Sequence, residues 1–122
     1  MDIKKLNGAI EGLKEDLGKA LVGCDLWESG VGQPIASFNT QPKATALFDS
    51  LTVQIRKMLK GAEFPDLDKF YSLDIENDLI VIVIQINKYQ LGMLVNSAEV
   101  NMGILYSIAI PNVRKAVEEG LK

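Results

Sequence analysis

The sequence predicts a three-layer α+β domain, with elements in the order helix, two strands, helix, three strands, helix. The first observation behind this prediction is the run Leu79–Ile86 (LIVIVIQI), which does not alternate apolar and polar residues. A half-buried strand alternates, so an unbroken β-branched run of strand length predicts an inner strand covered on both faces. The second observation is the spacing of apolar residues by three and four in other segments, which predicts the covering helices.

The first helix is predicted from a stripe of apolar residues, with possible caps at both ends. The stripe consists of Ile3, Leu6, Ile10, Leu13 and Leu17. Asp2 can cap the start of the helix, and Gly18 is placed to end it. The stripe spans under three heptads, which is too short for an independent coiled coil, so we expect it to lie on the sheet.

A hairpin follows the first helix. Residues 20–27 have a strand-like pattern and lead into Gly30 and Gly32, which can supply positive φ angles in a hairpin loop. The second strand is expected over residues 33–38. Pro34 cannot donate a ladder hydrogen bond, so it belongs at the beginning of this strand or on an edge.

The second helix is expected to begin at Pro42, with a capping side chain in residues 39–41. Its apolar residues share one face: Ala44, Leu47, Phe48, Leu51, Ile55, Met58 and Leu59. Arg56, Lys57 and Lys60 lie in the last turns, where we expect them to complement the helix dipole.

Three further strands and a final helix complete the predicted order. The strands are Phe70–Ile75, Leu79–Ile86 and residues 89–95, with turns between them. Asn96 and Glu99 have the spacing of a capping box, which predicts that the last helix begins there. Its expected buried face consists of Val100, Ile104, Leu105, Ile108 and Ala109. Pro111 predicts a kink or break in this helix.

Length, charge and composition limit the classes of protein to consider. We expect one domain over residues 1–122, and the net charge of −3 argues against nucleic-acid binding. No apolar stretch approaches the ~20 residues that span a bilayer, and the N-terminus does not resemble a signal peptide, so we expect no membrane association. A single cysteine, Cys24, suits a reducing compartment, and we expect a cytoplasmic protein.

Acidic residues are concentrated in residues 63–78, where six acidic side chains accompany only Lys69. One interpretation is a solvated loop and an edge strand whose charge resists aggregation. The alternative is an acidic rim that attracts a basic partner surface.

The chain lacks the residue combinations that catalysis usually needs. It has no histidine, and one cysteine cannot build a zinc site. Cys24, in a predicted strand, is interpreted as a small buried hydrophobe. The carboxylate pairs Asp66 with Asp68 and Asp74 with Glu76 lack supporting ligands. We therefore expect no enzyme, no catalytic residue, no metal and no cofactor.

The predicted layers leave part of the sheet uncovered. One helix about 10 Å wide cannot span five strands spaced about 4.7–4.9 Å apart. Either a second copy closes this gap in a symmetric dimer, which we favour, or the loop of residues 61–68 completes the cover in a monomer.

This order of elements resembles the roadblock/dynein light chain family, over nearly the whole chain. The resemblance rests on residues 23–37 (GCDLWESGVGQPIAS), the helix from Pro42, and the strand pair of residues 71–75 and 78–84. It implies a roadblock/profilin-like αββαβββα fold with a five-stranded antiparallel sheet between helices. The bacterial gliding-motility regulator of this family, which acts on a Ras-like GTPase, is the nearest functional analogue.

The resemblance implies a non-catalytic regulator or binding partner of a small Ras-like GTPase, acting as a homodimer. In such a dimer the second helices pack together and strand Phe70–Ile75 joins the two sheets. The implied interface residues are Leu47, Leu51, Ile55, Met58, Phe70, Ser72 and Asp74. The joining strand is acidic, so pairing brings like charges close unless Asp74 and Glu76 point into water. The resemblance assigns no role to the long tail of residues 96–122.

A regulator of this kind can act without inserting an arginine. Arg56 and Arg114 are the only arginines, and neither is expected in a flexible loop. Such a protein can hold the switch segments of the GTPase in one arrangement, which requires different affinities for the two nucleotide states.

Two other functions remain open. One is a nucleotide-independent adaptor that binds a peptide along a sheet edge. The other is a small-molecule sensor, which would place polar side chains in the core. Gln85 interrupts the central run, and Cys24 and Tyr89 are expected near it. The alternative for Gln85 is a strand-end side chain that reaches solvent.

Overall fold

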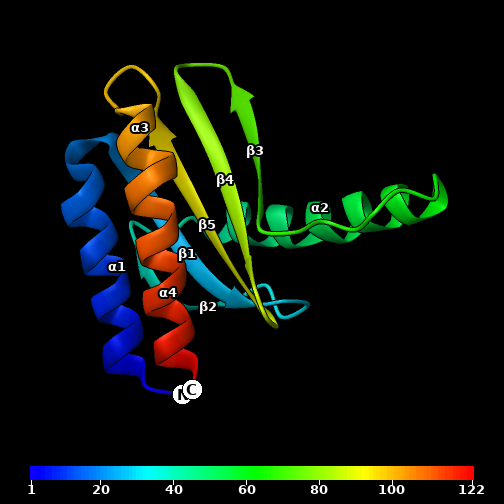
Figure 1. The fold of residues 1–122 in the computed structure, drawn as a ribbon, viewed down its shortest axis with the longest axis horizontal. Coiled ribbons are helices and arrows are strands. Elements are labelled where there is room, and N and C mark those ends of the chain that lie inside the picture. Colours follow the sequence, from blue (N-terminus) through cyan, green and yellow to red (C-terminus); the bar gives the residue numbers. More distant parts are fainter.

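The computed structural model describes all residues 1–122 and has the predicted order of elements (Figure 1). The main elements are α1 (Ile3–Leu17), β1 (Leu21–Glu28), β2 (Pro34–Phe38), α2 (Pro42–Gly61), β3 (Phe70–Ile75), β4 (Leu79–Ile86), β5 (Tyr89–Asn96), α3 (Met102–Ile104) and α4 (Ile110–Leu121). A 3₁₀ turn, Gly18–Ala20, follows α1, and a π-helical turn, Leu105–Ala109, joins α3 to α4.

The sheet is antiparallel throughout, with strand order β2-β1-β5-β4-β3. Helices α1 and α4 lie side by side on one face, and α2 crosses the other face and projects beyond the sheet (Figure 1). The predicted α+β fold, with its five-stranded sheet between helices, is confirmed.

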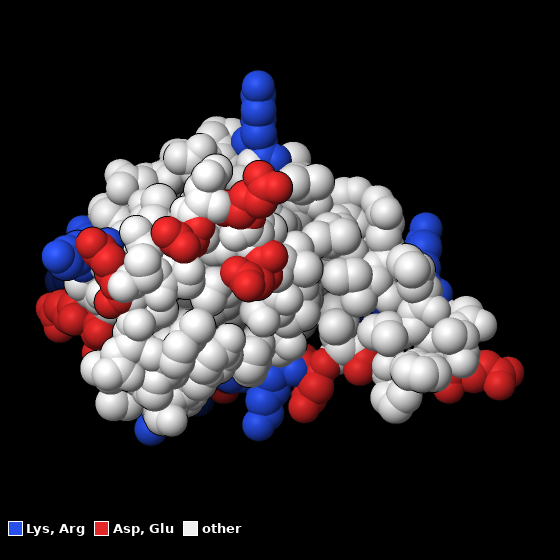
Figure 2. Space-filling view, turned by 90° about the horizontal axis from the view of Figure 1, so that it is seen from above, with Lys and Arg blue, Asp and Glu red and all other residues white.

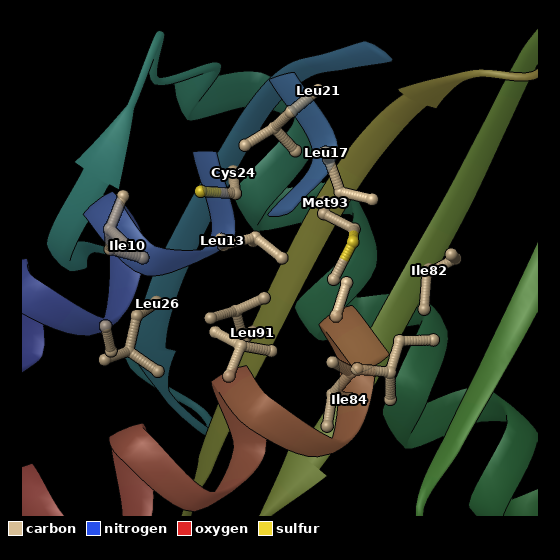
Figure 3. Packing of buried hydrophobic residues seen from close by; sticks show 14 of the residues in the cluster. Ile10, Leu13, Leu17, Leu21, Cys24, Leu26, Ile82, Ile84, Leu91 and Met93 are labelled. Atoms are coloured by element: carbon tan, nitrogen blue, oxygen red, sulfur yellow. The ribbon is translucent and has the colours of Figure 1, made fainter. Parts of the chain in front are cut away.

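The main hydrophobic core lies between the sheet and the α1–α4 pair. It holds 22 buried residues, with α1, β1, β5 and β4 all contributing side chains (Figure 3). Every residue of β4 from Ile80 to Ile86 is buried, as the unbroken apolar run predicts. Under α2 the buried apolar cluster contains only Trp27, Val81 and Val83. The two faces of the sheet are therefore packed very differently.

The predicted caps and turns of the N-terminal half are mostly confirmed. Asp2 Oδ1 accepts a hydrogen bond from Lys5 N at 3.1 Å, and Gly18 ends α1 with a φ of 57°. Gly30 and Gly32 adopt φ angles of 86° and 71° in the β1–β2 loop, a region that glycine enters without steric cost.

The start of the last helix was predicted wrongly. The Asn96 side chain accepts from Ala98 N in a turn, and the helix begins later, where Asn101 Oδ1 accepts from Ile104 N at 3.1 Å. Both asparagines have the right chemistry for a cap, so local sequence did not separate them.

Pro111 does not break the helix. The π-helical turn before it lets Ile110 N donate to Leu105 O, five residues back. This wider turn accommodates a proline that has no N–H and whose ring would clash in a regular helix.

The predicted buried face of this helix was partly wrong. Leu105 and Ala109 are buried, whereas Ile104 and Ile108 are 38% and 45% exposed. Each exposed isoleucine lies one residue before a buried position, which turns it about 100° away from the core.

Candidate functional site

Helix α2 buries very little of itself against the sheet. Only Thr45 and Thr52 of its 20 residues are buried. Phe48, which is half-buried, packs against the Trp27 cluster. The side of α2 that faces the sheet is therefore largely polar, and of the predicted apolar face only Ala44 and Phe48 are directed toward the sheet.

Asp49 makes the central contact between α2 and the strands. Its Oδ1 accepts hydrogen bonds from Trp27 Nε1 at 3.1 Å, Gly30 N at 3.0 Å and Gln90 Nε2 at 3.1 Å. These donors come from β1, the β1–β2 loop and β5. One carboxylate oxygen thus ties the middle of α2 to three separate segments.

Thr52 extends this network one turn further along α2. Its Oγ1 lies 2.7 Å from both the Tyr71 hydroxyl and Gln90 Oε1. Burial raises the pKa of Tyr71, while its hydrogen bond with Thr52 opposes that rise. Tyr71 therefore stays protonated and can donate to Thr52, whose own hydrogen is then free for Gln90.

Gln85 and Arg56 complete the network. Gln85 is 6% exposed, and its Oε1 accepts from Arg56 Nη2 at 3.0 Å, so the interpretation of Gln85 as a solvent-reaching strand end was wrong. Arg56 Nη1 also binds Asp66 Oδ2 at 2.7 Å. Arg56 therefore contacts the sheet and the following loop, beyond its expected role at the helix C-terminus.

The N-terminus of α2 is held by a strand and not by its own flanking side chains. Gln41 occupies the cap position without a side-chain hydrogen bond, which corrects the prediction of a cap from residues 39–41. Instead, Asp25 Oδ2 on β1 accepts from Gln41 N at 3.3 Å and from Thr45 Oγ1 at 2.9 Å. Residues distant in sequence thus supply the cap.

The four interface residues predicted on α2 lie together on its uncovered side. Leu47 and Met58 are 60% and 73% exposed, and Leu51 and Ile55 are half-buried. At 100° per residue these four positions span about 80° of the helix surface. We refer to Leu47, Leu51, Ile55 and Met58 as the outer stripe.

The loop after α2 leaves part of the outer stripe exposed. Residues 62–69 return alongside α2 toward β3, and all of them are exposed except Leu67, which is half-buried (Figure 1). Phe64 in this loop is itself 65% exposed. Leu47 and Met58 stay exposed beside it, so in a single chain this loop leaves part of the outer stripe uncovered.

Strand β3 is an open edge of the sheet, since it pairs only with β4. Its predicted interface residues lie opposite Ile84, Ile82 and Ile80, on the face that carries α4; they are Phe70, Ser72 and Asp74. Phe70 is 37% exposed, and its ring centroid lies 5.9 Å from that of Tyr106. Ser72 and Asp74 are exposed. The residues predicted to form an interface therefore lie in two sets, one on α2 and one on the β3 edge.

The surface around these two sets carries scattered charges. Seen from above, the projecting end of α2 at the right of the view is mostly uncharged, with charged side chains at its margin (Figure 2). No helix is both long enough and apolar enough to cross a membrane.

The sequence prediction missed the polar side of α2. Thr45, Asp49, Thr52 and Arg56 are spaced by four, three and four residues, so they form a polar stripe in the same way that apolar residues form a buried one. This spacing was available in the sequence. Their partners on the strands, Asp25 and Gln90, were not identifiable, because only the strand register brings them under the helix.

The ionisable groups do not assemble a recognisable reaction centre. Cys24 is 3% exposed, and burial raises the pKa of its thiol to about 12, so the thiolate is scarce at neutral pH. No group of three or more Cys, Asp or Glu side chains is arranged to hold a metal ion.

No protein-family model matches this chain, and no curated protein matches it either. Solved structures do. MglB from Myxococcus xanthus is 13% identical, with a TM-score of 0.77, and the alignment covers 100% of this chain and 94% of MglB.

Two further solved structures are similar to this chain over most of its length. The roadblock/LC7 domain from Streptomyces avermitilis is 14% identical with a TM-score of 0.72, covering 99% of this chain and 98% of that domain. The gliding protein MglB from Thermus thermophilus is 10% identical with a TM-score of 0.73, covering 95% of this chain and 90% of that protein. At such identities the likeness concerns the fold and not the activity. The chain therefore has the α+β fold shared by roadblock/LC7 domains and MglB.

Proposed function

We propose that this protein is a non-catalytic, homodimeric regulator or binding partner of a small Ras-like GTPase in the cytoplasm. The observation that carries the proposal is the uncovered outer stripe on α2. The fold likeness and the sequence resemblance to the roadblock/dynein light chain family support it, because members of that family present this helix to a second copy.

The outer stripe favours a second copy as its cover. Most of the stability of a helix in a protein comes from packing an apolar face, yet α2 buries only two threonines. Two antiparallel α2 helices related by a two-fold axis would cover each other's Leu47, Leu51, Ile55 and Met58. The open β3 edge, with Phe70, Ser72 and Asp74, can extend the same interface by strand pairing.

The two arginines favour regulation without an inserted arginine. Arg56 is bound to Asp66 and Gln85, and Arg114 to Glu118 Oε1 at 3.2 Å and Lys69 O at 3.3 Å. We infer that the protein acts by stabilising one arrangement of the GTPase switch segments. The acidic residues of the segment 63–78 would favour a basic surface on that partner.

The test is a comparison of partners captured in the two nucleotide states. The purified protein is immobilised and incubated with lysate of its source organism, half loaded with GDP and half with a non-hydrolysable GTP analogue. Bound proteins are identified and quantified by mass spectrometry. A Ras-like GTPase enriched by about tenfold or more in one half is the expected result, because a regulator of switch segments must discriminate between their states.

Purified components then provide the control. The captured GTPase, loaded with each nucleotide in turn, should bind the purified protein with the same preference. Equal recovery of a protein that is not a GTPase from both halves would contradict the proposal and support the adaptor function.

A further inference from the structure

A small cavity lies between the N-terminal half of α2 and the sheet. Its volume is about 60 Å³, and eight of its 13 lining residues are hydrophobic. Two glycines in its wall, Gly23 and Gly92, lie on neighbouring strands and place no side chain on this face of the sheet. A Cβ at Gly92 would come within 3.0 Å of the Trp27 ring, which shows how closely that ring packs over the glycine.

Asp25 is the only charged residue in the cavity wall. It lies on β1 opposite Gly92 of β5, and the residue is 6% exposed. Oδ2 accepts the two hydrogen bonds from Gln41 N and Thr45 Oγ1, but Oδ1, which is also buried, has no hydrogen-bond partner. A buried carboxylate oxygen without a partner is unfavourable, so the site lacks a donor.

The composition of the wall indicates which donor fits. No Lys, Arg or His lines the cavity, so no group of this chain neutralises Asp25 there. The rings of Trp27 and Phe48, which attract cations through their faces, belong to the same wall. Leu94 and Val81 provide apolar surface for a hydrocarbon chain. A cluster of waters fits poorly, because each buried water needs two to four polar partners.

We propose that this cavity binds a small primary alkylammonium ion. The ammonium donates a hydrogen bond to Asp25 Oδ1, and the alkyl chain lies against Phe48, Leu94 and Val81. Roughly 10–15 Å³ of cavity volume is needed to hold one water molecule, which has a single non-hydrogen atom. A cavity of about 60 Å³ therefore has room for about four to six non-hydrogen atoms. This inference is independent of the proposed GTPase and of the dimer.

Trp27 provides the readout, because it is the only tryptophan and lies in the cavity wall. The fluorescence of the purified protein is titrated with n-butylammonium chloride at constant pH and ionic strength. We expect the Trp27 fluorescence to change with n-butylammonium concentration and to reach a plateau. Little change is expected with n-butanol, which has a similar size and no charge, or with sodium chloride.

Three variants distinguish a loss of binding in the cavity from a general effect of substitution on the fold. Asp25→Asn removes the charge, and Ala44→Leu fills the cavity while leaving Asp25 and its two donors in place. Both should weaken n-butylammonium binding by about tenfold or more. Ala46→Leu, the same substitution at an exposed position of α2, should bind as the parent does. Circular dichroism checks that each variant is folded.

The source of the ammonium group is tested with Nα-acetyl-lysine methylamide, which carries the same butylammonium chain on a peptide backbone. Saturable binding of both probes supports a site that also admits a lysine side chain of another protein. Binding of n-butylammonium alone supports a site for a free amine. An equal response to n-butanol, no saturable response to either amine, or parent-like binding by folded Ala44→Leu would overturn the proposal.

Discussion

At the scale of single residues, buried polar side chains decide where α2 lies. Asp49, Thr52 and Gln90 make directional hydrogen bonds across the helix–sheet interface, whereas apolar packing there is limited to the Trp27 cluster. Hydrogen bonds depend on angle as well as distance, so they determine the rotation of a helix more strictly than apolar contacts do. The direction of the outer stripe therefore depends on these polar residues.

Thr52→Val tests this dependence. Valine keeps the shape of threonine but removes the oxygen that lies 2.7 Å from Tyr71 and from Gln90. The half-buried Tyr71 hydroxyl and the buried Gln90 side chain then each lose a hydrogen-bond partner. We expect the free energy of unfolding to fall by about 1–3 kcal/mol. Urea denaturation at fixed protein concentration measures the change.

Thr40→Val is the matched control, since Thr40 is exposed in the segment before α2. Its effect should stay within about 0.5 kcal/mol of zero. If the two substitutions had equal effects, the network would not be what holds α2 in place.

At the scale of elements, close approach of two backbones distinguishes α1 and α4 from α2. Asp2 N donates to Gly120 O at 2.7 Å, and Gly120 faces Leu6 where the two helices meet. A Cβ at Gly120 would lie 2.7 Å from Leu6 Cδ2 and 3.2 Å from Leu6 N. This glycine is therefore required by helix packing and not by backbone conformation.

Two glycine-to-alanine substitutions in these helices should have opposite effects. Gly120→Ala forces α1 and α4 apart, and we expect it to lower the free energy of unfolding by about 1–3 kcal/mol. Gly8→Ala, in the middle of α1 with open space around it, should raise it by about 0.5–1 kcal/mol.

Thermal and urea unfolding of both variants against the parent provides the measurement. Stabilisation by Gly120→Ala would show that the helices tolerate the extra methyl group, and the packing argument would then fail.

At the scale of the whole molecule, the sheet is strongly covered on one face and weakly on the other. The 22-residue core beneath α1 and α4 makes the chain stable on that side. The outer stripe of α2 and the open β3 edge leave apolar and backbone groups without a partner in a single copy. This asymmetry is why the proposed function requires a second chain.

Leu47→Asp tests the dimer directly. Leu47 is 60% exposed in the single chain, so a charge there should not disturb the monomer, but it would be buried in the proposed interface. We expect light scattering to give twice the 13.4 kDa chain mass for the parent and one chain mass for the variant.

Val53→Asp is the control on the same helix. Val53 is 44% exposed and lies about 160° round α2 from the outer stripe, so this variant should remain a dimer. Parent-like mass for folded Leu47→Asp would refute the assignment of the interface.

Much of the fold was predictable because it depends on local patterns. The unbroken β-branched run placed β4 inside the sheet, and the spacing of Leu6, Ile10 and Leu13 placed α1 on the core. The last helix was less predictable. Asn96 and Asn101 are equally suitable caps, and Pro111 by itself does not distinguish a break in the helix from the π-helical turn that precedes it.

The candidate site was predictable only in part. The outer stripe follows from helical spacing, so its four residues were identifiable in the sequence. The side of α2 that meets the sheet was not, because the partners of Asp49 and Thr52 come from β1, β5 and β3, and only strand register brings them together.

The sequence by itself therefore determined the order of elements, the inner position of β4 and the existence of an apolar stripe on α2. All three depend on the periodicity of neighbouring residues, which is a property of the chain alone. The tertiary structure decided which way that stripe points, and it left the buried Oδ1 of Asp25, a residue that lines the cavity under α2, without a hydrogen-bond partner. Hydrogen bonds between residues distant in the chain determine both features, and no local pattern records them.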